Sequence, residues 1–131
     1  MPWSEALTLG VAEIDVTHRA FVELADRLLA ADDATFPELF AELHAHTREH
    51  FDNEGRLMKA CRFPAIGEHH GEHLRVLGEL AYFSTAVRMG RLTAARLYAE
   101  NLPNWFATHL ATMDAALAAC LKRADDLPGK A

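Results

Sequence analysis

Apolar residues recur along the chain at helical spacing in four separate stretches. In the first stretch they occupy the i, i+3, i+4 and i+7 positions of one helix face, and the pattern fades at Asp32–Asp33. Three similar stretches follow. The pattern predicts helices at about residues 17–31, 36–61, 66–89 and 93–123, an N-terminal arm over residues 1–16, and a fraying tail over residues 124–131.

The segments between these stretches are short and contain residues that end helices. Phe63-Pro64 follows the second stretch, and Gly90 ends the third. Pro103 lies inside the fourth stretch, where it should kink or break the helix. Amphipathic helices with short connections favour an all-α fold, an antiparallel up-down-up-down four-helix bundle that forms one domain over residues 1–131.

Each predicted helix carries a histidine or a carboxylate on or beside its apolar stripe. These residues are His18 in the first helix, His50 and Glu54 in the second, His69 and His73 in the third, and His109 with the nearby Asp114 in the fourth. Burying such groups is costly unless they are paired or bind a metal. Residues four apart share a helix face, so two pairs of these side chains could each bind one centre. The pattern therefore favours a metal site inside the bundle.

The third helix leaves alternatives open. A single core histidine is more often hydrogen-bonded than metal-bound. His69 and His73 could also lie on a solvated face, because Glu68 and Glu72 are interleaved with them. His70 lies three residues before His73 and could replace His69.

Periodicity does not select Asp114 as a ligand. It lies five residues after His109, about 140° away around an ideal α-helix, and only a local π-bulge would bring it round. His46 shares a face with His50 and could support it or line a proton path, whereas an exposed position is favoured for His44 and for His70.

Composition excludes several classes of partner. The chain has 131 residues, eight histidines and a net charge of −6, without the basic patch of a nucleic-acid binder. It has no apolar run long enough to span a membrane and no secretory signal at its start, so we expect a cytoplasmic protein. Cys61 and Cys120 form no CxxC pair, and in an up-down-up-down bundle they should lie toward the same end as buried free thiols.

At this point the sequence resembles the hemerythrin family in its bacterial single-domain form. Four motifs in order carry the resemblance: Asp15-x-x-His18, His50-Phe51-x-x-Glu54, Phe63-Pro64 followed by His69 and His73, and Trp105-x3-His109-x4-Asp114. The resemblance covers nearly the whole chain, and it selects His69 over His70 and also selects Asp114.

The resemblance implies two iron ions with an oxo or hydroxo bridge, and dioxygen as the ligand. By position, His69, His73 and His109 would hold one iron, His18 and His50 would hold the other with a free place, and Glu54 and Asp114 would bridge both. A dry oxygen pocket is expected around them. Its candidate lining residues are Phe21, Phe51, Leu57, Met58, Trp105, Phe106, Leu110 and Met113.

Reversible oxygen binding for storage, delivery or sensing is the favoured function. A sensing role would need a separate protein partner. The first alternative is a di-iron enzyme or redox sensor acting on peroxide or nitric oxide, and the second is a structural zinc or iron-handling bundle. Five histidines against two carboxylates favour oxygen binding, because di-iron centres that activate oxygen usually hold more carboxylates.

Overall fold

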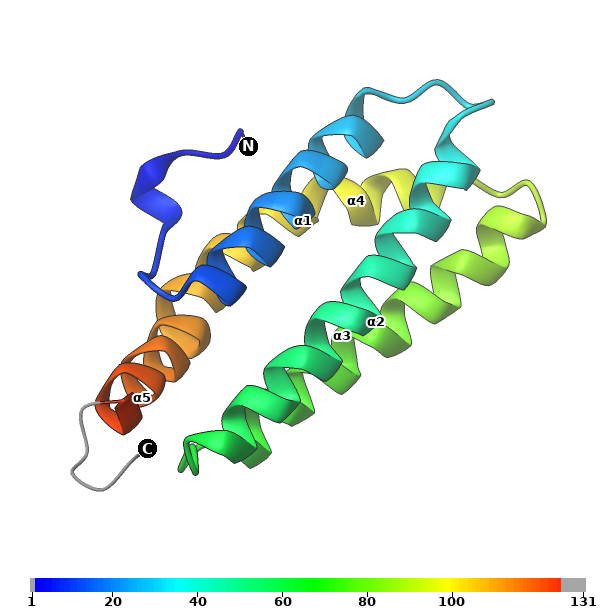
Figure 1. Ribbon diagram of the computed structural model, residues 1–131. Helices are drawn as coiled ribbons and strands as arrows, with labels where there is room; N and C mark the ends of the chain where they lie inside the picture. Colours follow the sequence, from blue (N-terminus) through cyan, green and yellow to red (C-terminus); the bar gives the residue numbers. More distant parts are fainter. Residues whose placement is uncertain (1, 126–131) are drawn as a thin grey trace.

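The described residues, 2–125, form an all-helical bundle in the computed structural model of the chain (Figure 1). The elements are the 3-10 turn η1 (Glu5–Leu7), α1 (Ala12–Ala30), α2 (Phe36–Ala60), α3 (Ile66–Arg88), α4 (Thr93–His109), the π segment η2 (Leu110–Asp114) and α5 (Ala115–Asp125). The last three elements follow one another without a break, so four helical rods make the bundle. The predicted antiparallel up-down-up-down four-helix bundle is confirmed.

Each helix packs against its neighbours in sequence, and the first packs against the last. α1 contacts α2 and α4, and α3 contacts the same two helices, while α5 contacts α2 at one end of the bundle. The larger core cluster lies between the rods and includes Leu28, Phe40, Leu43, Leu80 and Phe106, each at most 1% exposed. None of the described helices is long and apolar enough to cross a membrane.

The N-terminal arm is shorter than predicted, because α1 begins at Ala12 and not at residue 17. Ile14 is 1% exposed and extends the buried stripe of the helix back by one turn from His18. The Asp15 carboxylate accepts the backbone N–H groups of Leu9 and Gly10 at 2.7 and 3.0 Å, which fixes the turn into the helix. In the sequence, Ile14 and Asp15 were the residues that could have indicated this earlier start of the helix.

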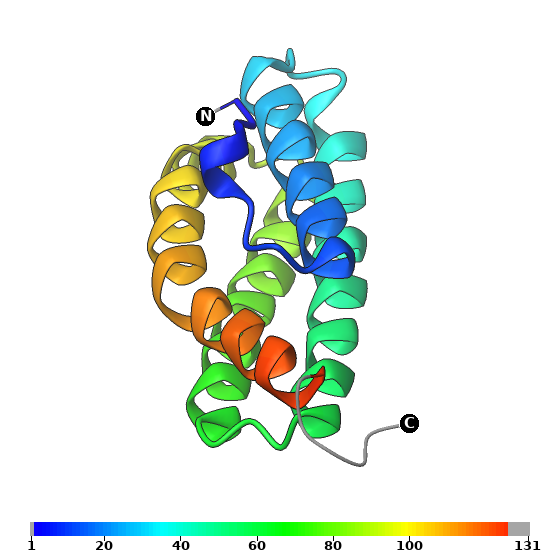
Figure 2. The same cartoon turned by 60° about the vertical axis from the view of Figure 1, so that its left-hand side comes forward.

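Gly10 allows the arm to pass close to the last helix. Its φ is +82°, and an added Cβ would lie 2.7 Å from the Lys122 Nζ atom. That ammonium group donates to the Leu9 carbonyl oxygen at 2.6 Å. Trp3 and Leu7 pack against the core from the arm. Figure 2 shows the arm crossing the side of the bundle formed by α1 and the α4–α5 rod.

Pro103 does not break the fourth helix. α4 runs from Thr93 to His109 with Pro103 inside it, so the predicted break is wrong, while a kink stays a prediction. Packing of α4 against both α1 and α3 holds the helix together where the proline removes one hydrogen bond. At the other end α5 continues to Asp125, so the first two residues of the tail predicted over residues 124–131 are helical. The rest of the predicted tail lies outside the described residues.

The two cysteines lie at the same end of the bundle, as predicted. The Cys120 thiol donates to the Cys61 carbonyl oxygen at 3.2 Å, and both thiols are free. Cys120 is buried as predicted, but Cys61 is only half-buried, so the predicted burial is wrong for Cys61. Burial, together with the neighbouring Cys120, raises the pKa of the Cys61 thiol to about 12. Thiols in such surroundings are inert, which agrees with a structural role.

Two glycines, one inside α3 and one just after it, test how much free space surrounds this helix. Gly78 lies inside α3 with nothing within 4 Å of an added Cβ, so Gly78→Ala should raise the free energy of unfolding by about 0.5–1 kcal/mol. Gly90 has equal space but a φ of +80°, so Gly90→Ala should lower it by about 1 kcal/mol. Urea denaturation followed by circular dichroism measures both. Destabilisation by Gly78→Ala would contradict this packing.

Candidate metal centre

All seven predicted ligand residues meet at the centre of the bundle. His18 comes from α1, His50 and Glu54 from α2, His69 and His73 from α3, His109 from α4 and Asp114 from η2. Their exposed fractions run from 0% to 6%. His69 and His73 are therefore core residues, and the alternative of a solvated face is wrong. His70 is exposed and lies outside the cluster, and His46 is half-buried and also outside it.

Helix geometry brings the pairs together in two different ways. His50 and Glu54, like His69 and His73, stand four residues apart in regular α-helix and so share a face. His109 and Asp114 stand five apart, and the chain between them is a π segment, in which the hydrogen bonds run from i to i+5. The wider turn brings Asp114 back to the face of His109. The π-bulge that the sequence only allowed is therefore present.

The two carboxylates divide their oxygen atoms between two groups of histidines. Glu54 Oε1 lies 3.2 Å from His69 Nε2 and 3.3 Å from His73 Nε2. Glu54 Oε2 lies 2.6 Å from His50 Nε2 and 3.3 Å from His18 Nε2. The carboxylate of Glu54 thus stands between two sets of imidazole nitrogen atoms.

Asp114 makes the same division. Its Oδ1 lies 3.1 Å from the Nε2 atoms of His69 and His109, and its Oδ2 lies 3.1 Å from His18 Nε2. One side of the carboxylate pair therefore faces three histidines, and the other faces two. Two overlapping groups of ligand atoms fit within the reach of single metal ions, one with His69, His73, His109, Glu54 and Asp114 and one with His18, His50 and Glu54.

The buried carboxylates and imidazoles change each other's pKa values. Burial alone would lower the pKa of His18, but Asp114 and Glu54 outweigh it and raise the pKa to about 9. The same causes, burial opposed by Asp114 and Glu54, raise the pKa of His69 to about 9. Burial lowers the pKa of His73 despite the opposing hydrogen bond to Glu54. Burial should raise the pKa values of Glu54 and Asp114, yet the nearby imidazole nitrogen atoms of the surrounding histidines lower both.

The polar atoms of the cluster fit a bound cation. Among the described residues, eight buried side-chain nitrogen and oxygen atoms have no hydrogen-bond partner, and all belong to this cluster. Four of these atoms meet at its centre, namely both Asp114 oxygen atoms, Glu54 Oε1 and His69 Nε2, and the other four are Nδ1 atoms of histidines. Two more nitrogen atoms, Nε2 of His73 and of His109, face each other at 3.3 Å. Such groups are stable in a core when a metal ion accepts their lone pairs, and imidazole with carboxylate suits iron.

Aromatic rings fix the imidazoles in place. Phe51 stacks on His73 with ring centroids 3.7 Å apart, Trp105 stacks on His109 at 4.8 Å, and the edge of Phe106 meets His18 at 5.1 Å. These contacts exclude water from one side of each ring.

Glu72 has a role that the sequence did not reveal. Its carboxylate accepts the Trp105 indole N–H at 2.8 Å and also pairs with Arg75 at 2.6 Å. Arg75 and Trp105 lower the pKa of Glu72 to about 2, with burial opposing. The acidic residue that suggested a solvated face thus holds the indole that stacks on His109. In the sequence, only its position one residue before His73 could have indicated that Glu72 lies near the cluster.

The predicted oxygen-pocket residues lie in several places around the cluster. Phe21 and Phe106 stack at 5.1 Å and line a hollow of about 10 Å³. Phe51 and Met58 line a different cavity of about 390 Å³ between α2 and α3, and Leu110 is buried in the larger core cluster. Leu57, Trp105 and Met113 are half-buried. A single oxygen pocket formed by all eight stays a prediction.

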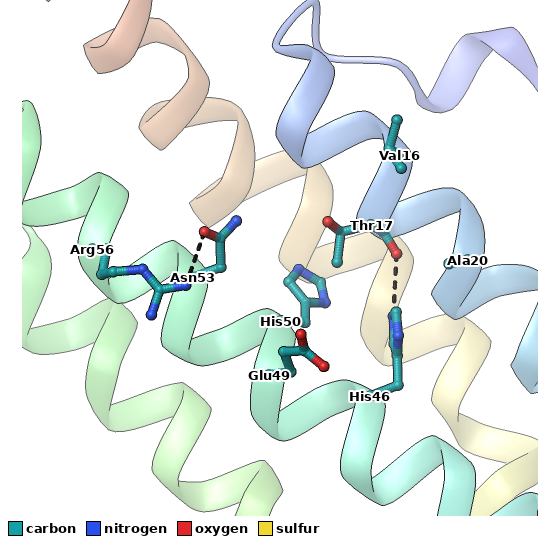
Figure 3. A pocket seen from close by; sticks show the side chains of 8 residues that line it. All are labelled: Val16, Thr17, Ala20, His46, Glu49, His50, Asn53 and Arg56. Carbon is teal, nitrogen blue, oxygen red and sulfur yellow. Dashed lines mark hydrogen bonds between the residues drawn. The ribbon is translucent and has the colours of Figure 1, made fainter.

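A pocket of about 310 Å³ between α1 and α2 reaches His50 (Figure 3). His46 stands beside it with its ring centroid 6.1 Å from that of His50, and its Nε2 donates to the Thr17 carbonyl oxygen at 3.3 Å. His46 therefore links α2 to α1 next to a predicted ligand.

Comparison with known proteins agrees with this geometry. The family model for the hemerythrin HHE cation binding domain matches residues 9–121. The chain belongs to the hemerythrin family. A bacteriohemerythrin of Ralstonia nicotianae is 37% identical over 112 residues, which cover 86% of this chain and 82% of that protein. Another of Stenotrophomonas maltophilia is 26% identical over 120 residues, which cover 88% and 78%.

Solved structures share the fold of this hemerythrin-family chain. The crystal structure of a wild-type hemerythrin superposes with a TM-score of 0.84 at 18% identity, covering 92% of this chain and 97% of that one. A point mutant of hemerythrin gives a TM-score of 0.85 at 18% identity, covering 92% and 96%. The family and the buried cluster together support an iron centre in a four-helix bundle.

Metal loading should stabilise the bundle. Ferrous iron added anaerobically to chelator-treated protein should raise the midpoint of thermal unfolding by more than about 10 °C, because it binds groups that meet only in the folded chain. Circular dichroism at rising temperature measures the shift. His70→Ala, outside the cluster, should show the same shift as the unaltered chain, and coincident melting curves with and without iron would contradict the metal centre.

Proposed function

We propose that this protein is a di-iron protein that binds dioxygen reversibly. The observation that carries the proposal is the division of Glu54 and Asp114 between three histidines on one side and two on the other. Both carboxylates present one oxygen atom to each side, which suits two ions that share them. The similarity to a bacteriohemerythrin and to hemerythrin supports the same function.

Each side of the two carboxylates would bind one iron ion. His69, His73 and His109 would hold one iron, and His18 with His50 would hold the other. The second ion would have one protein ligand fewer, so it is the side on which a small molecule can bind. When bound, two ferrous ions would supply the two electrons that dioxygen takes up and returns.

The surrounding residues suit binding better than oxidation of a substrate. Five neutral imidazoles and two carboxylates add less negative charge than the carboxylate-rich sites of bundles that activate oxygen. Phe106, 1% exposed, packs against His18 and excludes water on that side. His50, on the two-histidine side, lines a pocket between α1 and α2. These features favour storage, delivery or sensing of oxygen over turnover of peroxide or nitric oxide.

A gas cycle tests the function. Protein loaded with ferrous iron should develop charge-transfer bands in the visible spectrum when oxygen is admitted and lose them when oxygen is withdrawn. Bands that persist would indicate oxidation to a stable ferric form and would favour the enzyme or redox-sensor alternative, as would steady turnover of peroxide or nitric oxide. A spectrum that does not respond to oxygen would contradict oxygen binding.

Metal counting tests the assignment of the ligands. Asp114→Ala should reduce the iron content of the loaded protein to well below one ion per chain, because both sides lose a ligand and a negative charge. His50→Ala should leave about one ion, held by the three-histidine side. Native mass spectrometry distinguishes these states.

The control for His50→Ala is His46→Ala, one turn earlier on α2 and outside the cluster. It should keep both ions. Equal loss of iron from the His46 and His50 variants would contradict the assignment.

A further inference from the structure

A second cavity lies between α2 and α3, away from the metal centre. It has a volume of about 310 Å³, and its polar lining residues are His44, Arg48, Ser84 and Arg88. Pro37, Phe40, Ala41, Ala45 and Val87 form its apolar walls. His44 precedes His50 by six residues, about 9 Å along the helix axis. Cavities of this size that combine apolar walls with a few polar groups are typical of small-molecule sites.

His44 is not the exposed residue that the sequence favoured. It is half-buried and stands in a chain of hydrogen bonds across the two helices. Its Nε2 lies 3.2 Å from the Arg48 Nη2, and its Nδ1 lies 3.0 Å from the Ser84 Oγ. Ser84 is 8% exposed.

The chemistry of the three side chains determines which atom donates in each of these hydrogen bonds. A guanidinium group has only donors, so Arg48 donates to His44 Nε2, and that nitrogen carries no proton. The neutral ring then holds its proton on Nδ1 and donates it to Ser84 Oγ. The Ser84 hydroxyl keeps its own hydrogen to donate, and Ser84 lines the cavity. This row of hydrogen bonds therefore ends in a hydroxyl donor at the cavity wall.

Positive charge at the cavity is uncompensated. Arg48 and Arg88 form no ion pair with any carboxylate of the described residues, although the protein as a whole carries a charge of −6. Burial lowers the pKa of His44, and Arg48 and Arg88 lower it further, with no carboxylate among the opposing causes. The charged side chains that line the cavity are thus two exposed arginines, which suits an anion.

We propose that this cavity binds a small organic carboxylate with an apolar body. Arg48 and Arg88 would hold the carboxylate, the Ser84 hydroxyl would donate to it, and Phe40 and Val87 would cover the apolar part. An inorganic anion would leave these walls in contact with water and gain nothing from them. The site is separate from the oxygen-binding centre and does not depend on it.

Titration calorimetry of the iron-loaded chain with benzoate tests the proposal. Benzoate should bind once per chain with a Kd of about 1 mM or tighter, and benzamide, its neutral counterpart, should bind at least about tenfold more weakly. Inorganic phosphate should also bind more weakly than benzoate. Equal affinity for benzamide or phosphate, or no binding of benzoate at 10 times that concentration, would overturn it.

Variants locate the binding. Arg48→Gln, Arg88→Gln and Ser84→Ala should each weaken benzoate binding, the arginine changes by at least about tenfold. The matched control is Arg56→Gln, because Arg56 lines the separate pocket at His50. It should leave the affinity unchanged, and saturating benzoate should leave the charge-transfer bands of the iron centre unchanged. Loss of binding in Arg56→Gln, or altered bands, would assign the anion to the iron side and overturn the proposal.

Discussion

Glu54 and Asp114 lie together at the middle of the bundle, 1% and 0% exposed, and the structure around them depends on how their charge is neutralised. Two carboxylates cannot stay ionised in an apolar core without positive partners. Protonated imidazoles can neutralise them in part, and the raised pKa values of His18 and His69 follow from that demand. Metal ions neutralise them more fully, because they also take up the lone pairs that the cluster leaves without partners.

The rest of the architecture holds these groups in place. All four rods contribute a residue to the buried cluster, so the cluster joins every helix of the bundle to its neighbours. Residues four apart supply two of the pairs, and a π segment supplies the third. Aromatic rings such as Phe51 and Trp105 lie against the imidazoles and limit their rotation. The uneven division into three and two histidines then follows from which helix each histidine stands on, and in the proposed function it leaves one ion with fewer protein ligands than the other.

The sequence predicted the parts of this arrangement that follow from regular helix geometry. His50 and Glu54 share a face at any position in an α-helix, so their pairing was readable from spacing alone. The spacing did not predict that Asp114 shares a face with His109, because its position depends on a local departure from the α-helical repeat. Only the resemblance to a family selected Asp114. The start of α1 was placed too late, since the helix is fixed by a side-chain contact from Asp15 to the arm.

Contacts between helices were the least predictable. His44 and Ser84 lie 40 residues apart, and no periodicity connects them, yet their hydrogen bond joins α2 to α3 at the second cavity. The bond from Trp105 to Glu72 spans 33 residues and turns an apparently solvated acid into a support for His109. Such pairs depend on the rotation of one helix against another, which a hydrophobic pattern fixes only coarsely.

The proposed function depends on two iron ions that share Glu54 and Asp114. A crystal structure of the iron-loaded protein, with anomalous scattering recorded at the iron absorption edge, would show whether they do. We expect two iron peaks, each bonded to one oxygen atom of both carboxylates, with three histidines on one ion and two on the other. A single peak, or two peaks that do not share these carboxylates, would contradict it.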